Sequence, residues 1–355
     1  MTAAQDFTFP GISTRVVFGR GTIASTGAEV ARLGHRSALV LSTPHQVEDA
    51  ERLAASLGSV SAGVFPGAVM HTPVEVTEQA LARFSASGAT AVIALGGGST
   101  TGLGKAIAAR TGADQIVIPT TYAGSEMTDI LGETAHGEKV TRRDPSIRPE
   151  TVIYDVDLTL SLPVAMTVTS TLNAIAHAVE ALYAADRNPV VEMMSSAAMA
   201  DFARTLPRLV ADPQDVEARA VMLKAAWYCS VALSQVSMAL HHKLCHTLGG
   251  TFNTPHAETH AIMIPHTTGF NAAAVPDLLA PVSAAFGATP GAGLHDFARS
   301  VGAPMALRDL GLTQADLDRA ADLATRNPYS NPRPFTRNEI RDLLDDAWSG
   351  RRPRF

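Results

Sequence analysis

The stretch LGGGSTTGLGKAIA, residues 95–108, places three consecutive glycines between an apolar run and a helix-like segment. Glycine has no Cβ, so the backbone of such a turn can approach a phosphate closely. The free N–H groups at the start of the following helix then face the phosphate with the positive end of the helix dipole. We therefore predict pyrophosphate contacts at Gly97, Gly98 and Ser99, although a strand–helix turn without ligand would have the same composition.

The first half of the chain alternates short apolar runs with helix-like stretches. This alternation predicts a parallel sheet covered by helices on both faces. A polar, glycine-containing segment at residues 134–144 predicts a hairpin beside that sheet. The predicted strands are 37–42, 91–95, 115–119 and 151–154, and the predicted helices between them are 22–33, 46–55 and 73–87.

The sequence changes in character after residue 162. Alanine, leucine and methionine dominate there, and strand-like runs largely vanish. We therefore predict a Rossmann-like α/β dinucleotide-binding domain over residues 1–162 and an all-helical domain over residues 163–355. The helices predicted in the second domain are 172–183, 190–210, 216–238, 243–250 and 312–324.

Two more polar segments directly follow predicted strands, one at residues 42–43 and one at residues 119–129 (PTTYAGSEMTD). Loops at the carboxyl ends of neighbouring strands form the ligand crevice of an open α/β sheet. No Asp or Glu stands at residues 42–44 to select a free ribose 2′-hydroxyl, so NADH and NADPH are both compatible. The cofactor contacts predicted here are Ser42, Thr43, Thr120, Thr121 and Ser125.

Composition excludes several other classes of protein. The chain has 355 residues, of which 46% are hydrophobic and 17% charged, and a net charge of −6, so neither disorder nor general affinity for nucleic acid is expected. No signal peptide or membrane-length apolar run is visible. The two cysteines, Cys229 and Cys245, form no CxxC pair, which favours a reducing compartment. We expect a cytoplasmic enzyme without a nucleic-acid or membrane partner.

Residues 241–260, HHKLCHTLGGTFNTPHAETH, contain five of the twelve histidines. Clustered imidazoles indicate metal binding or acid–base chemistry. His242 and His246 are four residues apart and share a helix face, as do Asn173 and His177. The remaining histidines of interest are His260 and His266, which we expect to be structural, and His241, whose role is left open.

The motifs GGGS, PTT…GSE, NxxxH and HxxxH…PH, in this order, resemble the iron-containing alcohol dehydrogenase superfamily. Typical metal-dependent members have GGGSxxD, PTTxGTGSE and DxxxH, whereas this chain has GGGSTTG, PTTYAGSE and NAIAH (173–177). These departures resemble maleylacetate reductases, as do the segments HHKLCHTLGG, PHAETHA and NPYSNPRP (327–334). That resemblance implies NADH- or NADPH-dependent reduction of maleylacetate to 3-oxoadipate in aromatic catabolism, with the site in the cleft between the two domains. It also implies a homodimer, in which an edge at residues 7–18 could pair across a two-fold axis.

The resemblance also implies roles for individual residues. The metal-ligand positions of the family fall on Asn173, His177, His242 and His256, and its active-site histidine falls on His246. Asn173 stands where a carboxylate is usual, and a neutral amide is a weaker donor to a dication. We therefore expect catalysis without a metal. If a metal is present, its predicted ligands are His177, His242 and His256.

Alkene reduction fits this expectation. Hydride adds to a carbon conjugated to a ketone, negative charge moves to the ketone oxygen, and a proton must then reach the adjacent carbon. Imidazole groups can hold the developing oxyanion and supply the proton near neutral pH. We assign these tasks first to His246 and His242, with His177 and His256 in support; spacing does not tell which histidine is the acid.

The proposed substrate carries two carboxylates, and each needs a cation or hydrogen-bond donors. An arginine could hold a carboxylate through two hydrogen bonds, although surface arginines of a solvent loop would look the same in the sequence. The predicted substrate contacts are Tyr122, Asn173, Lys243, Arg326 and Arg333.

Three other functions remain open. A metal-dependent alcohol or aldehyde reductase of the same superfamily would lose activity on chelation. A lyase of the dehydroquinate-synthase type would use NAD without net consumption. A nucleotide-binding sensor would need no acid–base histidines, which the pairing of His242 with His246 disfavours.

Overall fold

The computed structural model describes residues 6–135, 138–327 and 329–354 of the chain. These described residues divide into two compact units: residues 12–162, and residues 163–354 together with residues 6–11. The side-chain amide of Gln235 donates to the Gly11 carbonyl across 3.2 Å, which attaches this segment to the helical unit. None of the described helices is long and apolar enough to cross a bilayer.

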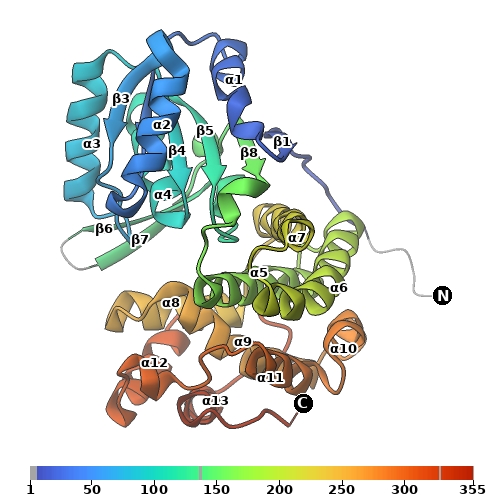
Figure 1. The fold of residues 1–355 in the computed structure, drawn as a ribbon. Helices are drawn as coiled ribbons and strands as arrows, with labels where there is room; N and C mark the ends of the chain where they lie inside the picture. Colours follow the sequence, from blue (N-terminus) through green and yellow to red (C-terminus); the bar gives the residue numbers. More distant parts are fainter. Residues whose placement is uncertain (1–5, 136–137, 328, 355) are drawn as a thin grey trace. The chain divides into compact units, whose positions relative to one another are not determined.

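The first unit is built on a six-stranded parallel sheet in the order β1-β8-β5-β4-β2-β3 (Figure 1). The expected strands are present, and the sequence missed the two edge strands, β1 and β3. Phe18 of β1 is 39% exposed, and every residue of β3 is half-buried. These edge strands therefore lack the continuous apolar pattern of the central strands. The strands are β1 Arg15–Gly19, β2 Ala38–Leu41, β3 Ser61–Phe65, β4 Ala91–Gly96, β5 Asp114–Pro119 and β8 Thr151–Asp155.

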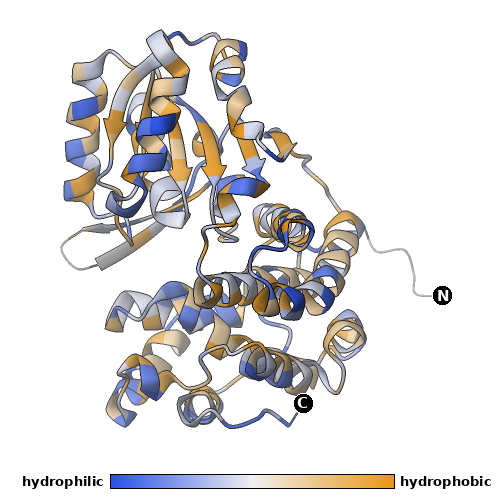
Figure 2. Ribbon diagram, viewed as in Figure 1, coloured by the Kyte–Doolittle hydropathy of each residue, from blue (hydrophilic) through white to orange (hydrophobic). Residues whose placement is uncertain are grey.

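Helices cover both faces of this sheet. The helices α1 (Thr26–Arg32) and α2 (Val47–Leu57) contribute Val30 and Leu53 to the core on one face. On the other face, α3 (Val74–Ser87) and α4 (Gly98–Thr111) contribute Phe84 and Leu103. The strands are accordingly the most hydrophobic part of this unit (Figure 2). The hairpin expected at 134–144 is present as β6 Ile130–Ala135 and β7 Glu138–Arg143.

The second unit is helical, as predicted. Its longest buried element is α5, in which every residue from Thr167 to Tyr183 is buried, and which packs against α6, α7 and α9. The sequence expected residues 216–238 to be one helix, but α7 ends at Gln235 and a new helix begins at Leu240. The helices are α5 Val164–Tyr183, α6 Pro189–Ala211, α7 Val216–Gln235, α8 Leu240–Phe252, α9 His256–Ala272, α10 Ala280–Phe286, α11 Pro290–Ser300, α12 Gln314–Thr325 and α13 Arg337–Ser349.

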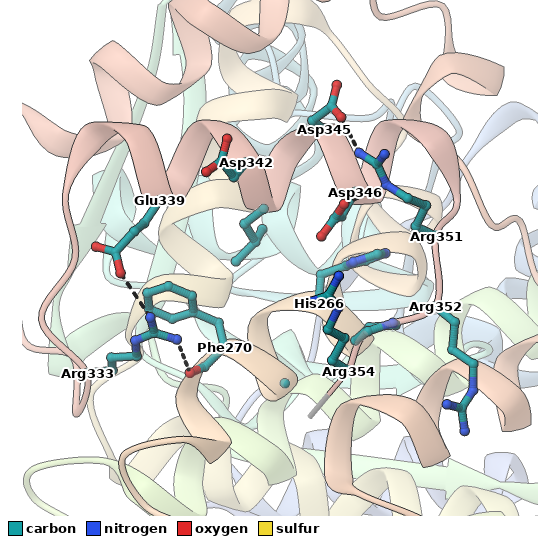
Figure 3. A pocket seen from close by; sticks show the side chains of 13 residues that line it. His266, Phe270, Arg333, Glu339, Asp342, Asp345, Asp346, Arg351, Arg352 and Arg354 are labelled. Carbon is teal, nitrogen blue, oxygen red and sulfur yellow. Dashed lines mark hydrogen bonds and ion pairs between the residues drawn. The ribbon is translucent and has the colours of Figure 1, made fainter.

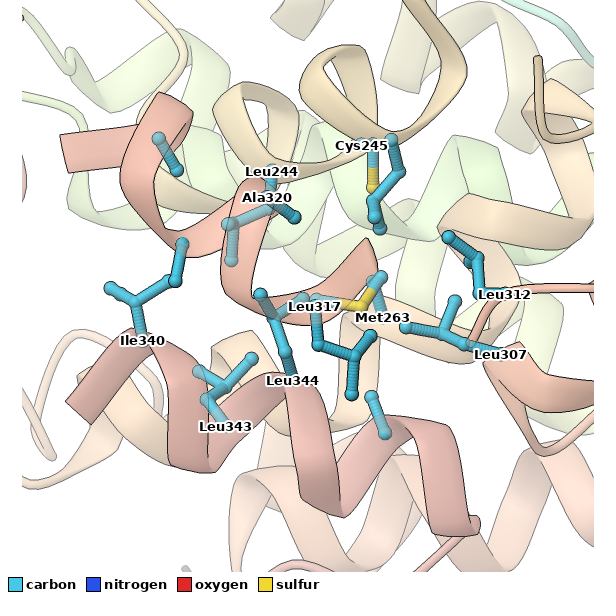
Figure 4. Close-up of a cluster of buried hydrophobic side chains, with 14 of the residues drawn as sticks. Leu244, Cys245, Met263, Leu307, Leu312, Leu317, Ala320, Ile340, Leu343 and Leu344 are labelled. Carbon is cyan, nitrogen blue, oxygen red and sulfur yellow. The ribbon is translucent and has the colours of Figure 1, made fainter. Parts of the chain in front are cut away.

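A hydrophobic cluster holds α8 and α9 against the C-terminal helices. Leu244 of α8, Met263 of α9, Leu317 of α12 and Leu344 of α13 are fully buried in it (Figure 4). Burial of such side chains stabilises the fold by about 1.5–3 kcal/mol each. The cluster therefore fixes the two helices that carry most of the histidines.

Candidate active site

The three predicted cofactor loops meet at one edge of the sheet. They follow β2, β4 and β5, which are neighbouring parallel strands. The Gln46 side chain links two of the loops, because its Nε2 donates to Thr120 Oγ1 across 2.9 Å and its Oε1 accepts from Thr43 Oγ1 across 3.2 Å. The Thr120 amide donates to the Gly96 carbonyl across 3.1 Å. The structure thus brings the polar loops together as a single surface.

The glycine loop ends at the N-terminus of α4. Gly97 is the N-cap residue, and no side chain caps the helix. A Cβ on Gly97 would lie 3.1 Å from both Cγ2 and Oγ1 of Thr121, so a larger residue there would press the Thr121 side chain away by a few tenths of an ångström. Gly98 is exposed and Ser99 is half-buried. Gly98 and Ser99 begin α4, and free amides at a helix N-terminus are suited to an anion; the pyrophosphate contact stays a prediction.

Lys105 holds the loop that contains Ser125. Its Nζ donates to the Ser125 carbonyl across 2.6 Å, to Thr128 Oγ1 across 2.8 Å and to the Ile130 carbonyl across 3.0 Å. Burial lowers the pKa of Lys105 to about 7. Sequence reasoning missed this residue, although a lysine within the otherwise apolar LGKAIA segment was a visible signal.

Three helices bring the predicted histidines together in the second unit. His177 lies on α5, His242 and His246 on α8, and His256 on α9. The rings of His177 and His242 stack with centroids 5.1 Å apart, and His242 and His246 lie 5.9 Å apart. The His246 and His256 centroids are 6.4 Å apart. His260, for which no catalytic role was expected, lies within the same group, 4.3 Å from His256 and 5.0 Å from His242.

These rings differ in their access to solvent. His246 is exposed and His256 half-buried, whereas His177 and His242 are 3% and 5% exposed. Burial, with a smaller contribution from neighbouring imidazoles, lowers the pKa of His177 and His260 well below the usual value. These two rings are therefore neutral at pH 7 and offer lone pairs. His246, predicted from the sequence as a catalytic residue, is the one of these four side chains that is exposed.

Glu180 is a site residue that the sequence analysis missed. It lies three residues after His177 on α5 and is fully buried. Its carboxylate accepts Nδ1–H of His242 across 2.6 Å, and the backbone amides of Ala239 and His241 across 3.0 and 2.8 Å. Glu180 thus accepts hydrogen bonds from backbone amides at the start of α8, where the N-cap residue provides no side-chain hydrogen bond. The i,i+3 spacing from His177 could have revealed it.

The predicted substrate contacts are not all in one place. Asn173 is buried on α5, and Lys243 of α8 places Nζ 5.8 Å from the centre of the Tyr329 ring. Tyr122 is fully buried within the sheet unit. Arg326 is exposed at the end of α12.

Arg333 lines a separate hollow of about 520 Å³ at the C-terminal end of the chain (Figure 3). Its guanidinium donates to the Phe270 carbonyl across 3.1 Å and to Glu339 across 2.9 Å, and stacks 3.9 Å from the centre of the Phe270 ring. Among the histidines that the structure describes, His266 alone lines this hollow. The structure therefore gives Arg333 partners within the protein and does not bring it to the histidine group.

Comparison with known proteins identifies the family to which the sheet unit and the helical unit belong. Residues 13–156 match the family of iron-containing alcohol dehydrogenases, and residues 167–348 match the C-terminal part of the Fe-containing alcohol dehydrogenase family. The chain therefore belongs to the iron-containing alcohol dehydrogenase family.

Within that family, the chain is similar to proteins named maleylacetate reductase. It is 55% identical to one from Rhizobium sp. (strain MTP-10005), over 98% of this chain and 99% of that protein. It is 49% identical to maleylacetate reductase 1 of Rhodococcus opacus, over 99% and 98%. The crystal structure of maleylacetate reductase from Agrobacterium tumefaciens superposes with a TM-score of 0.95 at 55% identity and covers 99% of this chain and 100% of that one.

The family contradicts the expectation that no metal is needed. Both matching models describe iron-containing enzymes, and ligand atoms of His241, Cys245 and His260 lie within 4.8 Å of one another. The expectation rested on the missing carboxylate at Asn173. It did not foresee that Glu180 provides a buried carboxylate beside His242, which makes a ligating imidazole more basic.

The residues present fit a divalent ion. Among the described residues, Nδ1 of His177 and Nε2 of both His242 and His260 are buried without a hydrogen-bond partner. Unpartnered buried nitrogen lone pairs are costly, and a metal ion would satisfy them. His177 and His242 belong to the predicted ligand set, whereas His260 does not.

Proposed function

We propose that this chain is an NADH- or NADPH-dependent reductase that converts maleylacetate to 3-oxoadipate. The observation that carries the proposal is the histidine group on α5, α8 and α9, in a chain about half identical to maleylacetate reductases. The three converging loops of the sheet unit support a dinucleotide cofactor, with the pyrophosphate at Gly98 and Ser99.

The proposed catalytic roles of the residues follow from whether each side chain is buried or exposed. Hydride leaves the nicotinamide for the alkene carbon, and the electron pair of the C=C bond moves toward the ketone oxygen. His246, exposed and next to His256, delivers the proton to the adjacent carbon, which completes addition of H⁻ and H⁺. Glu180 fixes the orientation of the His242 ring. A divalent ion held by the buried imidazoles would supply a Lewis acid for the oxygen that gains charge.

Substrate binding and assembly are further parts of the proposal. Lys243 and Asn173 are placed near the histidines in sequence and structure, and the exposed Arg326 is the better candidate for a carboxylate clamp, because Arg333 is engaged elsewhere. β1 is an edge strand paired with β8, which supports homodimer formation along that edge. Both cysteines are free thiols, as suits a cytoplasmic enzyme.

The test is NADH and NADPH oxidation, followed by absorbance, with maleylacetate as substrate and metal-loaded protein. We expect rapid oxidation with 3-oxoadipate as product. Oxidation with simple aldehydes but none with maleylacetate would reject this substrate and favour an alcohol or aldehyde reductase. That second candidate is supported by the TM-score of 0.90, at 25% identity, with a 1,3-propanediol oxidoreductase.

A further inference from the structure

Lys105 lies on α4, the helix that begins at the glycine loop, and only 1% of its surface is exposed. Burying an ammonium group is costly unless its protons have acceptors. The Lys105 Nζ is 2.6 Å from the Ser125 carbonyl, 2.8 Å from Thr128 Oγ1 and 3.0 Å from the Ile130 carbonyl. Three acceptors match the three protons of the charged form, whereas a neutral amine would leave one acceptor unpaired.

All three acceptors belong to the segment that follows β5, which contains the short helical turn Ser125–Met127. The Thr128 hydroxyl donates its own proton to the Ser125 carbonyl across 3.0 Å, so it accepts from Lys105. The Ser125 hydroxyl, a predicted cofactor contact, is buried and has no hydrogen-bond partner among the described residues. A buried hydroxyl without a partner is costly, and a bound ligand would satisfy it. Lys105 therefore holds the backbone of Ser125 and leaves its hydroxyl for a ligand.

Charged groups on the neighbouring segments also act on this ammonium. The acidic groups Glu126 and Asp129 favour its charged form, the basic groups Arg143 and Arg148 oppose it, and burial, the largest effect, lowers the pKa of Lys105 to about 7. Asp129 is already paired with both arginines, 3.5 Å from Arg143 and 3.3 Å from Arg148. The three hydrogen bonds and Glu126 are therefore what keep Lys105 charged, and its proton is within reach of an ordinary change in pH.

We infer that Lys105 is a positioning residue for the dinucleotide cofactor, which ties the loop at Ser125 to α4 so that this loop and the glycine loop are held at a fixed spacing. This role rests on the proposed function, because it takes these loops as the NADH site. Lys105 is itself too buried to touch a ligand, so it acts through Ser125. Loss of its proton removes one of the three hydrogen bonds, loosens the loop and weakens NADH binding.

A lysine that only stabilises the fold would behave differently. Its removal would lower the thermal midpoint, because buried acceptors would lose their donors. It would leave the Kd for NADH of the folded protein, and the pH dependence of that Kd, as they are in the wild type. The pH dependence of cofactor binding therefore separates a positioning role from a structural one.

The test measures the Kd for NADH by fluorescence titration of the full-length protein between about pH 6 and 9, without maleylacetate. Lys105→Met keeps an unbranched side chain and removes the three donors. At the acid end, where wild-type Lys105 is charged, the variant should have a Kd at least about tenfold higher than the wild type. The wild-type Kd should rise by up to about tenfold per unit above pH 7, and the Kd of Lys105→Met should not follow this rise.

Arg110→Met is the matched control, since it removes a cation of the same helix that bonds to Glu133 and to the Ala106 carbonyl. It should keep the wild-type Kd and its pH dependence. Where Lys105→Met fails to fold, Thr128→Val decides, because it removes one of the three acceptors and leaves the lysine in place. It should raise the Kd by about 3- to 10-fold, the equivalent of one hydrogen bond.

A wild-type Kd in Lys105→Met, or in Thr128→Val where that variant decides, would overturn the inference. So would a pH dependence of the Kd in Lys105→Met equal to that of the wild type, or an equal loss of affinity in Arg110→Met. Absence of NADH binding by the wild type would reject the cofactor of the proposed function together with this inference. NADH binding without maleylacetate reduction would reject the proposed substrate alone, so the two failures are distinguished.

Discussion

His242 donates its Nδ1 proton across 2.6 Å to the carboxylate of Glu180, a residue 62 positions earlier in the chain. Both side chains are buried. The same carboxylate accepts two backbone amides at the start of α8. One residue therefore begins the helix that carries the central histidines and orients one of them.

Glu180→Gln should lower turnover about 10- to 100-fold, because a neutral amide makes a weaker hydrogen bond to His242 Nδ1 than the carboxylate and orients the ring less firmly. The free energy of unfolding should fall by about 1–3 kcal/mol, since the NH2 group that replaces one carboxylate oxygen cannot accept the hydrogen bonds which that oxygen accepts. Steady-state kinetics and urea unfolding measure the two effects. Glu258→Gln in the first turn of α9 makes the same charge change outside this network and serves as control. Wild-type turnover in Glu180→Gln would remove Glu180 from the mechanism.

His246→Ala should lower turnover by about 10²–10⁴-fold, the usual contribution of a general acid. The side chain is exposed, so its removal leaves the fold intact. The cofactor affinity, measured by NADH fluorescence titration, should stay within about twofold of the wild-type value, because His246 lies in the helical unit and the glycine loop in the other. If turnover does not change, another group donates the proton.

Gly98→Ala should weaken NADH binding without affecting stability. The added Cβ would meet only Ala123 Cβ, at an ordinary 3.8 Å, yet it would occupy the space over an uncapped helix N-terminus. Gly27→Ala is the matched control, because its Cβ would also make an ordinary contact, 3.6 Å from Leu57. We expect the Kd for NADH to rise at least tenfold in the first variant only. Equal Kd values in both would place the pyrophosphate elsewhere.

The two predicted arginine clamps should behave differently. Arg326→Ala should raise the KM for the dicarboxylate about 10- to 100-fold, the equivalent of one or two charge-assisted hydrogen bonds. Arg333→Ala should leave KM unchanged and lower the thermal midpoint, because Arg333 bonds to Phe270 and Glu339. A raised KM in Arg333→Ala alone would reverse this assignment.

His266 should make stability depend on pH. Burial lowers its pKa from the ordinary 6.5 to about 3. Between these two pH values the unfolded chain binds a proton at His266 and the folded chain does not. The stability contributed by neutral, buried His266 is therefore fully present above pH 6.5 and is lost as the pH falls. His266→Gln should therefore reduce the slope of unfolding free energy against pH by about 1.4 kcal/mol per unit between pH 5 and 6. Denaturant melts at several pH values provide the slope, and an unchanged slope would contradict the assignment.

The sequence was informative wherever a local pattern carried the signal. Continuous apolar runs specified the buried parallel strands, and glycine and threonine after those strands marked polar loops that meet at one edge of the sheet, because parallel strands end at a common edge. The i,i+4 spacing of His242 and His246 placed them on one face of α8. The motifs between Gly96 and the PHAETHA segment were enough to indicate the family.

Tertiary structure decided what depends on groups far apart in the chain. No local pattern shows that Glu180 meets His242 or that His241 meets both Thr267 and His260, because contacts among three packed helices depend on how those helices fold together. The expectation that no metal is needed was corrected for the same reason. The sequence showed the carboxylate absent from position 173, and only the packing of α5 against α8 supplied one at Glu180.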